Sequence, residues 1–152
     1  MCSETPKSSL SSLVVRPIKS EEACQFKALL AEHHYLGASP KIGETLWYVA
    51  TCRDSWAALL TFLAAALKSA ARDQWIGWDY RHRYDRLKLL ANNSRFLILP
   101  GWSLPNLGSR VLALCAKRIS SDWEKRFGHA PLLLETFVDP GRYRGTVYRA
   151  AN

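Results

Sequence analysis

The strongest signal for chemistry lies where an apolar strand pattern leads into a helix pattern in the C-terminal half of the chain. Phe96 to Leu99 has the composition of a buried strand that Pro100-Gly101 ends, and helical spacing of apolar residues begins at about Asn106. Free backbone N–H groups and the helix dipole make a helix N-terminus a binding place for anions. The sequence therefore predicts an anion or pyrophosphate cradle. Its candidate residues are Asn106, Leu107, Gly108, Ser109 and Arg110.

A carboxylate stands inside the next apolar strand pattern. Glu135 interrupts the sequence from Leu132 to Val138, where a charge is costly unless it is paired or exposed at a cleft. At a cleft, this carboxylate would suit a general base. An ion pair with Arg95 or Arg144 is the structural alternative, and both interpretations remain open.

A segment rich in Trp and Arg separates the third expected strand from the fourth. Aromatic rings interleaved with arginines can stack on bases and contact phosphates. The candidate residues for nucleic-acid binding are Arg72, Trp75, Trp78, Arg81, Arg83 and Arg86. Tryptophans beside a buried Arg72–Asp73 ion pair would equally serve as a structural anchor for the insertion.

Length and composition predict one globular domain. The chain has 152 residues, of which 48% are hydrophobic. This length and hydrophobic content are enough for a core without disulfides or metals. The formal net charge is +8. The charge favours a polyanionic partner, such as DNA, RNA or an anionic cofactor, although a soluble basic surface has the same composition. The four cysteines are scattered, without a C-x-x-C motif or histidines at metal spacing, which predicts reduced thiols, no metal site and a cytoplasmic protein. The longest apolar run, Trp56 to Leu67, is too short to span a membrane, and no signal peptide is visible.

The patterns of the N-terminal half predict a strand, a helix and a hairpin. We expect a flexible polar tail over residues 1–12, with the single domain over 13–152. The expected elements are a strand over Leu13–Ile18, a helix from Ser20 to about Leu36-Gly37, and strands over Glu44–Thr51 and Trp56–Phe62 joined by a turn at Arg53-Asp54-Ser55.

The C-terminal half is expected to alternate between strands and helices after the insertion. The insertion is expected to contain an Ala-rich helical stretch over Ala64–Ala71 and an irregular region over Arg72–Asn93 with a turn at Asn92-Asn93. A strand over Phe96–Leu99 follows, then a helix from about Asn106 and a further helix start at Ser121–Glu124 that Gly128 ends. The last expected elements are a strand over Leu132–Val138 and a helix that begins at Asp139-Pro140. This order predicts an α/β fold, with a mixed sheet flanked by helices.

The order of elements resembles the GNAT acetyltransferase fold. In that fold the fourth strand leads into a pyrophosphate-binding loop of pattern Q/R-x-x-G-x-G/A, which corresponds here to Ser103 through Gly108. Gly108 is the residue that matches, and Pro105 lacks an amide that could donate to phosphate. The resemblance implies acetyl-CoA or another acyl-CoA as cofactor, with Ser109 and Arg110 partly compensating at the helix start.

The same resemblance implies roles for three further side chains. Tyr148 lies on the last helix, where GNAT enzymes often place a tyrosine that protonates the departing CoA thiolate; alternatively, its ring packs on the sheet. His33 and His34 end the first helix, where GNAT enzymes line the acceptor site, although a helix C-terminus also stabilises a histidine. The catalytic candidates are Tyr148, Glu135 and His34.

Five ordered motifs resemble DruA, a protein family of the Druantia anti-phage system whose members also occur beside or fused to transposase-like genes. They are His34–Gly37 (H-Y-L-G), Arg72–Trp78 (R-D-Q-W-I-G-W), Asn92–Pro100 (N-N-S-R-F-L-I-L-P), Leu134–Asp139 (L-E-T-F-V-D) and Tyr148–Asn152 (Y-R-A-A-N). The family usually continues beyond the last motif, so the resemblance implies a copy shortened at its C-terminus.

The resemblances imply a role in phage defence or mobile-element biology, with two competing mechanisms. In one, the domain is an acyltransferase-like enzyme or a relative that still binds the cofactor. In the other, the basic insertion makes it a non-catalytic module that binds DNA, RNA, or another defence or transposase protein. A shortened copy without activity is the third alternative.

Overall fold

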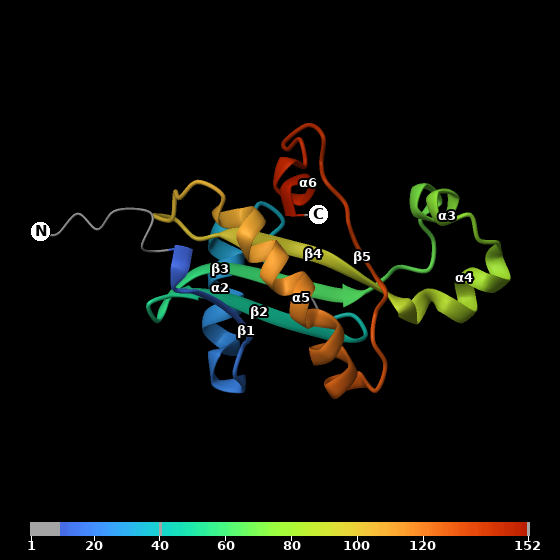
Figure 1. Cartoon of the computed structure of the whole chain (residues 1–152), viewed down its shortest axis with the longest axis horizontal. Coiled ribbons are helices and arrows are strands. Elements are labelled where there is room, and N and C mark those ends of the chain that lie inside the picture. The colour runs from blue at the N-terminus through green and yellow to red at the C-terminus, as the bar shows by residue number, and fades with distance from the viewer. Residues whose placement is uncertain (1–9, 40, 152) are drawn as a thin grey trace, which may run out of the picture.

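The computed structural model describes residues 10–39 and 41–151 and arranges them around one five-stranded sheet in the order β1-β2-β3-β4-β5 (Figure 1). The strands are β1 (Leu13–Pro17), β2 (Thr45–Cys52), β3 (Ser55–Ala64), β4 (Leu90–Ile98) and β5 (Leu133–Thr136). Neighbouring strands are antiparallel except for the last pair, because β5 runs parallel to β4. The expected mixed sheet is confirmed.

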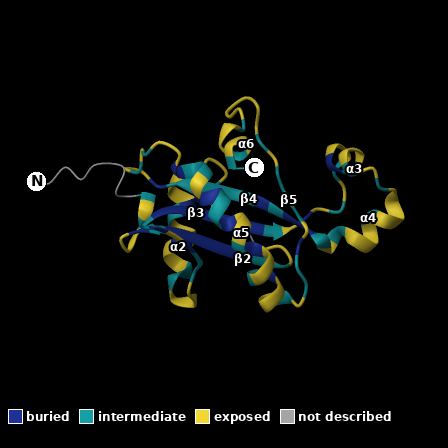
Figure 2. Ribbon diagram, viewed as in Figure 1, coloured by how far each residue is buried: buried dark blue, intermediate teal, exposed yellow. Residues whose placement is uncertain are grey.

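Helices cover both faces of this sheet. The short 3-10 helix η1 (Ser20–Glu22) leads into α2 (Ala23–His33), whose Phe26 and Leu30 are buried with Trp47 and Leu59 against one face. The long helix α5 (Leu107–Phe127) is buried on the other face. The C-terminal helix α6 (Thr146–Ala151) packs beside α5. The central strands β2 and β3 are therefore the most deeply buried part of the chain (Figure 2).

The hairpin turn and the end of α5 agree with expectation, whereas α2 ends at His33 rather than at the expected Leu36-Gly37. Cys52 pairs with Ser55 across a two-residue turn in which Arg53 and Asp54 both have positive φ, as hairpin turns of this length require. Gly128 ends α5 in the left-handed conformation that favours glycine. Residues 1–9 of the expected tail lie outside the described part, and Leu10 packs against the core.

The insertion between β3 and β4 is more regular than the sequence indicates. It consists of α3 (Ala70–Ile76), α4 (Tyr80–Arg86) and the 3-10 helix η2 (Leu87–Leu89). The helix expected over Ala64–Ala71 is wrong, because β3 continues to Ala64 and α3 begins only at Ala70. The turn expected at Asn92-Asn93 is also wrong. Both residues lie inside β4, where their side-chain amides have hydrogen-bond partners.

Two other boundaries differ from expectation. No new helix begins at Ser121–Glu124, because α5 runs through this segment, with Trp123 buried and Asp122 paired to Arg118 four residues earlier. Asp139 does not cap the last helix. Its carbonyl accepts the N–H groups of Arg142 and Tyr143 in a separate turn, and α6 begins only at Thr146.

Candidate functional site

A pocket opens where the two parallel strands separate. β4 pairs with β5 from Leu90–Leu133 to Asn93–Thr136, and β4 then continues to Ile98 while β5 ends. The gap is a cavity of about 470 Å³. Its lining comes from residues 33–36 at the end of α2, residues 93–98 of β4, residues 136–139 after β5, and residues 143–148 at the start of α6. The strand pairing of the sheet therefore determines where the pocket lies.

Ser94 is the first residue of β4 beyond the paired stretch, and it lines this pocket. Its Oγ is buried and has no hydrogen-bond partner among the described residues. A buried hydroxyl without a partner is costly, and it stays available to a ligand group that enters the pocket. Ser94 therefore marks the pocket as a place for a polar ligand.

Tyr148 reaches the same pocket from α6. Its hydroxyl donates to Asn93 Oδ1 at 2.8 Å, and the Asn93 amide is held by hydrogen bonds to the carbonyls of Thr61 and Arg95. Burial raises the pKa of Tyr148 above its ordinary value. The phenol is therefore neutral at physiological pH, and its proton is held at a defined position.

His34 also lines the pocket, from the end of α2. Burial and the nearby Arg95 charge lower the pKa of His34, which favours the neutral ring. The backbone N–H of Leu36 donates to His34 Nδ1 at 3.1 Å, so the ring proton of the neutral form resides on Nε2. In this arrangement His34 offers a hydrogen-bond donor to the pocket rather than a general base.

Glu135 is not brought together with Tyr148 and His34. Its carboxylate pairs with Arg72 at 3.3 Å and accepts from the Asn92 side-chain amide. The ion-pair partner is thus neither Arg95 nor Arg144, which were the residues expected from the sequence. A carboxylate that is committed to a buried guanidinium does not serve as the base of this pocket.

The start of α5 tests whether the expected cradle fits a cofactor diphosphate. Asn106 has the left-handed conformation, and its carbonyl accepts from Arg110 N–H and from Ser109 Oγ. A Cβ placed on Gly108 would lie 3.0 Å from Val147 Cγ1 of α6. Val147 therefore packs closely over Gly108 and leaves no room for a side chain there. Val147 also lines the pocket, whereas none of the residues Asn106 to Arg110 does.

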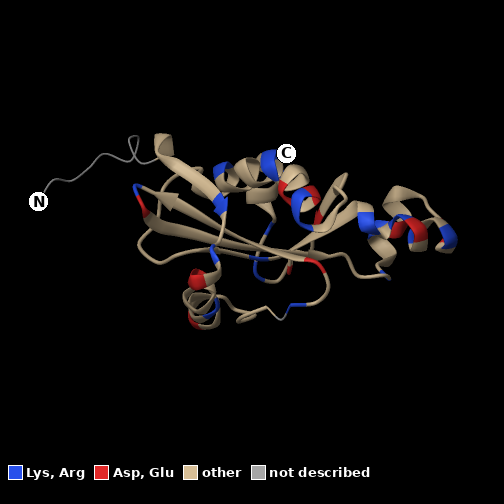
Figure 3. Cartoon of the chain, turned by 90° about the horizontal axis from the view of Figure 1, so that it is seen from below, with Lys and Arg blue, Asp and Glu red and all other residues tan. Residues whose placement is uncertain are grey.

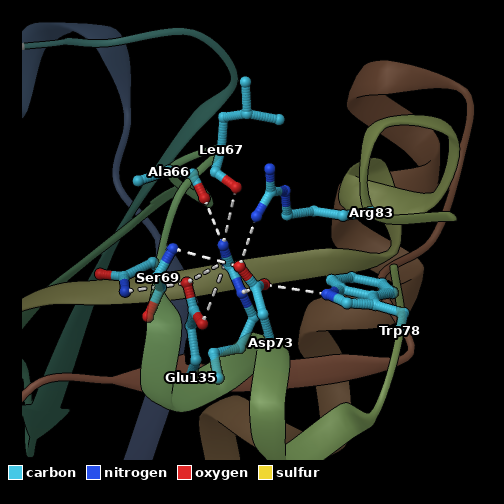
Figure 4. A network of polar contacts seen from close by, with 9 residues as sticks. Ala66, Leu67, Ser69, Asp73, Trp78, Arg83 and Glu135 are labelled. Atoms are coloured by element: carbon cyan, nitrogen blue, oxygen red, sulfur yellow. Dashed lines mark hydrogen bonds and ion pairs between the residues drawn. The ribbon is translucent and has the colours of Figure 1, made fainter. Parts of the chain in front are cut away.

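The Trp/Arg-rich insertion is held by a polar network around Arg72 and Asp73 (Figure 4). The Arg72 side chain is only 5% exposed, and it contacts Asp73, Glu135 and the carbonyls of Ala66 and Leu67. Trp78 Nε1 and Arg83 donate to the same Asp73 carboxylate. Although burial opposes it, these donors lower the pKa of Asp73 below its usual range. Arg72 is therefore an anchor, which corrects its assignment to nucleic-acid binding.

The other five candidates of the insertion fall into two groups. Trp78 and Arg83 are largely enclosed by their contacts with Asp73 and belong with the anchor. Trp75, Arg81 and Arg86 are exposed. The buried anchor and the exposed aromatic and basic surface are therefore formed by different residues of the insertion.

Several pocket residues were missed by reasoning from the sequence. Asn93 was interpreted as part of a turn, and Ser94 was not singled out, although two polar residues next to an apolar strand were the available signal. Asp139 and Tyr143 line the pocket as well. A helix was expected to begin at Asp139-Pro140, so the loop that brings these two residues to the pocket was not predicted. Within residues 10–39 and 41–151, no cluster of His, Cys, Asp and Glu could hold a metal ion, and no helix is long and apolar enough to cross a membrane.

The parallel pair that diverges around a pocket, with α2 on one face of the sheet and α5 on the other, defines a GNAT-like acetyltransferase fold. Two crystal structures of the aminoglycoside acetyltransferase meta-AAC0020, from an uncultured soil metagenomic sample, are similar to it. The sisomicin complex has a TM-score of 0.57 and 9% sequence identity to this chain. The trehalose complex has a TM-score of 0.56 and 12% sequence identity. Each match covers 93% of this chain and 88% of the acetyltransferase chain. The family model described as Druantia protein DruA matches residues 3–152, so the chain belongs to the DruA family. A comparison with curated proteins finds no match.

Proposed function

We propose that this GNAT-like DruA protein binds an acyl-CoA-type ligand in the pocket between β4 and β5, and that it acts as an acyltransferase-like component of phage defence. The observation that carries the proposal is the interrupted pairing of β4 and β5 beside the buried hydroxyl of Ser94. The family and the fold support a defence-related protein of this class. The ligand and the site that binds it are the new elements of the proposal.

The chemical argument starts from the backbone. Parallel strands exchange evenly spaced hydrogen bonds, and the pairing of β4 with β5 stops at Asn93, leaving the segment from Ser94 to Ile98 facing a cavity. An extended ligand with amide groups can pair with such an edge as an additional strand does. The pantetheine arm of an acyl-CoA is an extended chain with amide groups, so it matches both the shape and the hydrogen-bonding character of the gap.

The nucleotide end of the ligand lies elsewhere. Val147 occupies the space over Gly108, so we assign no phosphate contact to the first turn of α5. In this proposal recognition comes from the arm, and the diphosphate extends out of the pocket. When bound, the ligand would supply a thioester carbonyl.

The groups that this chain offers to the reacting end are proton donors. Tyr148 keeps its phenolic proton because burial raises its pKa. In the free protein this proton is donated to Asn93 Oδ1, and the hydroxyl would turn it from there toward a leaving thiolate. His34 also lines the pocket, and its Nε2–H is a second donor. A donor pair of this kind suits protonation of a leaving thiolate and polarisation of a carbonyl.

Ser94→Ala tests the proposed binding site. We expect binding of acetyl-pantetheine to weaken by about three- to tenfold, because one hydrogen bond contributes about 0.5–1.5 kcal/mol. The stability of the free protein should be unchanged or slightly increased, since the variant removes a buried hydroxyl that has no partner. Titration calorimetry and thermal unfolding measure the two effects.

Ser109→Ala is the matched control, because it removes the same hydroxyl from the start of α5, where Ser109 Oγ bonds to the Asn106 carbonyl outside the pocket. It should leave the affinity for acetyl-pantetheine unchanged. Equal affinities of the wild type and Ser94→Ala would show that the ligand does not use the Ser94 hydroxyl.

A further inference from the structure

The insertion formed by α3 and α4 stands away from the sheet (Figure 1). It carries an unusual number of exposed rings. Trp75 is 76% exposed, Tyr80 63% and Tyr84 67%. Aromatic side chains contribute most to stability when buried, so exposure of all three within ten residues is not explained by the fold. This surface has no part in the pocket between β4 and β5.

The insertion is anchored rather than loosely attached. Asp73 accepts hydrogen bonds from Arg72, Trp78 and Arg83, and Arg72 also pairs with Glu135 on β5 (Figure 4). Arg83 in addition lies 5.0 Å from the centre of the Tyr80 ring. The network joins α3, α4 and the sheet, so the exposed rings are presented on a fixed support.

Tyr80 and Tyr84 lie on one face of α4. They are four residues apart, which is the spacing that brings side chains together on a helix. Together with Arg81 and Asp85 they line a shallow depression of about 240 Å³. The depression thus combines two rings, a cation and a carboxylate.

The charge of the insertion favours an anionic partner. From Lys68 to Lys88 the chain has six Lys and Arg residues against three Asp. One of those carboxylates, Asp73, is already surrounded by Arg72 and Arg83. Figure 3 marks the positions of both basic and acidic residues on this part of the ribbon, and the basic residues are in excess.

We propose that this surface binds single-stranded nucleic acid. Bases stack on Tyr80 and Tyr84, and Arg81 contacts the adjacent phosphate, as in proteins that combine aromatic platforms with basic grooves. Asp85 can accept a hydrogen bond from the exocyclic amino group of cytosine. Paired bases are stacked within the duplex and present no free face to the rings, so the surface selects unpaired strands.

The test measures fluorescence anisotropy of labelled DNA and RNA strands of about 12 nucleotides with the purified chain. Tyr80→Leu/Tyr84→Leu should weaken binding by about tenfold or more for each ring, because stacking contributes about 1–3 kcal/mol per base. Tyr80→Phe/Tyr84→Phe keeps both rings and should keep the affinity. All four side-chain replacements lie on the surface, so the fold is retained.

Charge is tested by a matched pair. Arg81→Ala should weaken binding and reduce its salt dependence by about one counterion. Lys117→Ala removes the same charge from an exposed position on α5 and should have a much smaller effect. The relative affinities for DNA and RNA strands of one sequence identify which of them is preferred.

The proposal is overturned if the wild-type chain binds no single strand at about 50 mM salt, if the Leu variant binds as tightly as the wild type, or if duplexes bind equally well. The last two outcomes would indicate a general electrostatic surface. The absence of binding would leave the exposed rings as a docking surface for a protein. None of these outcomes affects the pocket between β4 and β5.

Discussion

Replacing Arg72 by methionine is expected to lower the free energy of unfolding by about 3–5 kcal/mol, because removing one partner of a buried ion pair leaves the other charge without compensation. The Arg72 side chain is 5% exposed and contacts Asp73, Glu135 and two backbone carbonyls. Methionine has a similar volume but no donor. Each acceptor therefore loses its bond to Arg72, Glu135 keeps only the Asn92 amide, and Asp73 keeps Trp78 and Arg83. Urea unfolding monitored by tryptophan fluorescence measures the loss.

The control for this variant is Arg81→Met, which removes an arginine from an exposed position of the same insertion and should change stability by about 0.5 kcal/mol or less. The double variant Arg72→Met/Glu135→Leu should recover part of the lost unfolding free energy, because it also removes the carboxylate that Arg72→Met alone leaves without its cation. An unchanged unfolding free energy for Arg72→Met would mean that the network does not anchor the insertion.

Tyr148→Phe is expected to reduce acyl transfer by about a hundredfold or more, which is the usual range for loss of a positioned proton donor. The phenol holds its proton because burial raises its pKa, and Asn93 directs it. The ring itself stays in place against Phe96, so stability should change by about 1 kcal/mol. Thiol release from acetyl-pantetheine or acetyl-CoA, followed with a thiol-reactive dye in the presence of a panel of acceptors, gives the rate.

Tyr143→Phe is the matched control, because Tyr143 also lines the pocket and is half exposed, while its hydroxyl has no assigned role. It should retain its rate. Tyr148→Phe with a wild-type rate would assign the Tyr148 ring to packing alone. Unchanged affinity for acetyl-pantetheine in both variants would show that the effect is on chemistry rather than on binding.

The sequence predicted the regular parts of the fold well. The hairpin of β2 and β3 follows from β-rich segments on both sides of a polar turn, and the start of α5 follows from helical spacing after Pro100-Gly101. Errors occurred where tertiary contacts satisfy residues that usually favour turns or caps. Asn92 and Asn93 lie in β4 because Glu135 and two carbonyls accept from their amides. Local propensity contains no information about such distant partners.

The candidate site was predicted in part. Tyr148 and His34 line the same pocket, whereas Glu135 is turned toward Arg72, a partner 63 residues away in the chain. Gly108 matches a cofactor-loop pattern, yet its missing side chain accommodates Val147 of α6. A single glycine therefore permits either close approach of a ligand or close packing of a helix. Only the three-dimensional arrangement distinguishes these two uses.

The most direct test of the proposed function is to measure the melting temperature of the wild-type chain with acetyl-pantetheine, acetyl-CoA and adenosine 3′,5′-bisphosphate in turn. A ligand that binds only the folded state stabilises it by about 2.7 kcal/mol at a hundredfold excess over its Kd, which raises the melting temperature of a domain of this size by about 5–10 °C. Arm-based recognition predicts similar increases for acetyl-pantetheine and acetyl-CoA and none for the bisphosphate. Stabilisation by acetyl-CoA and the bisphosphate without acetyl-pantetheine, or by none of the three, would contradict it.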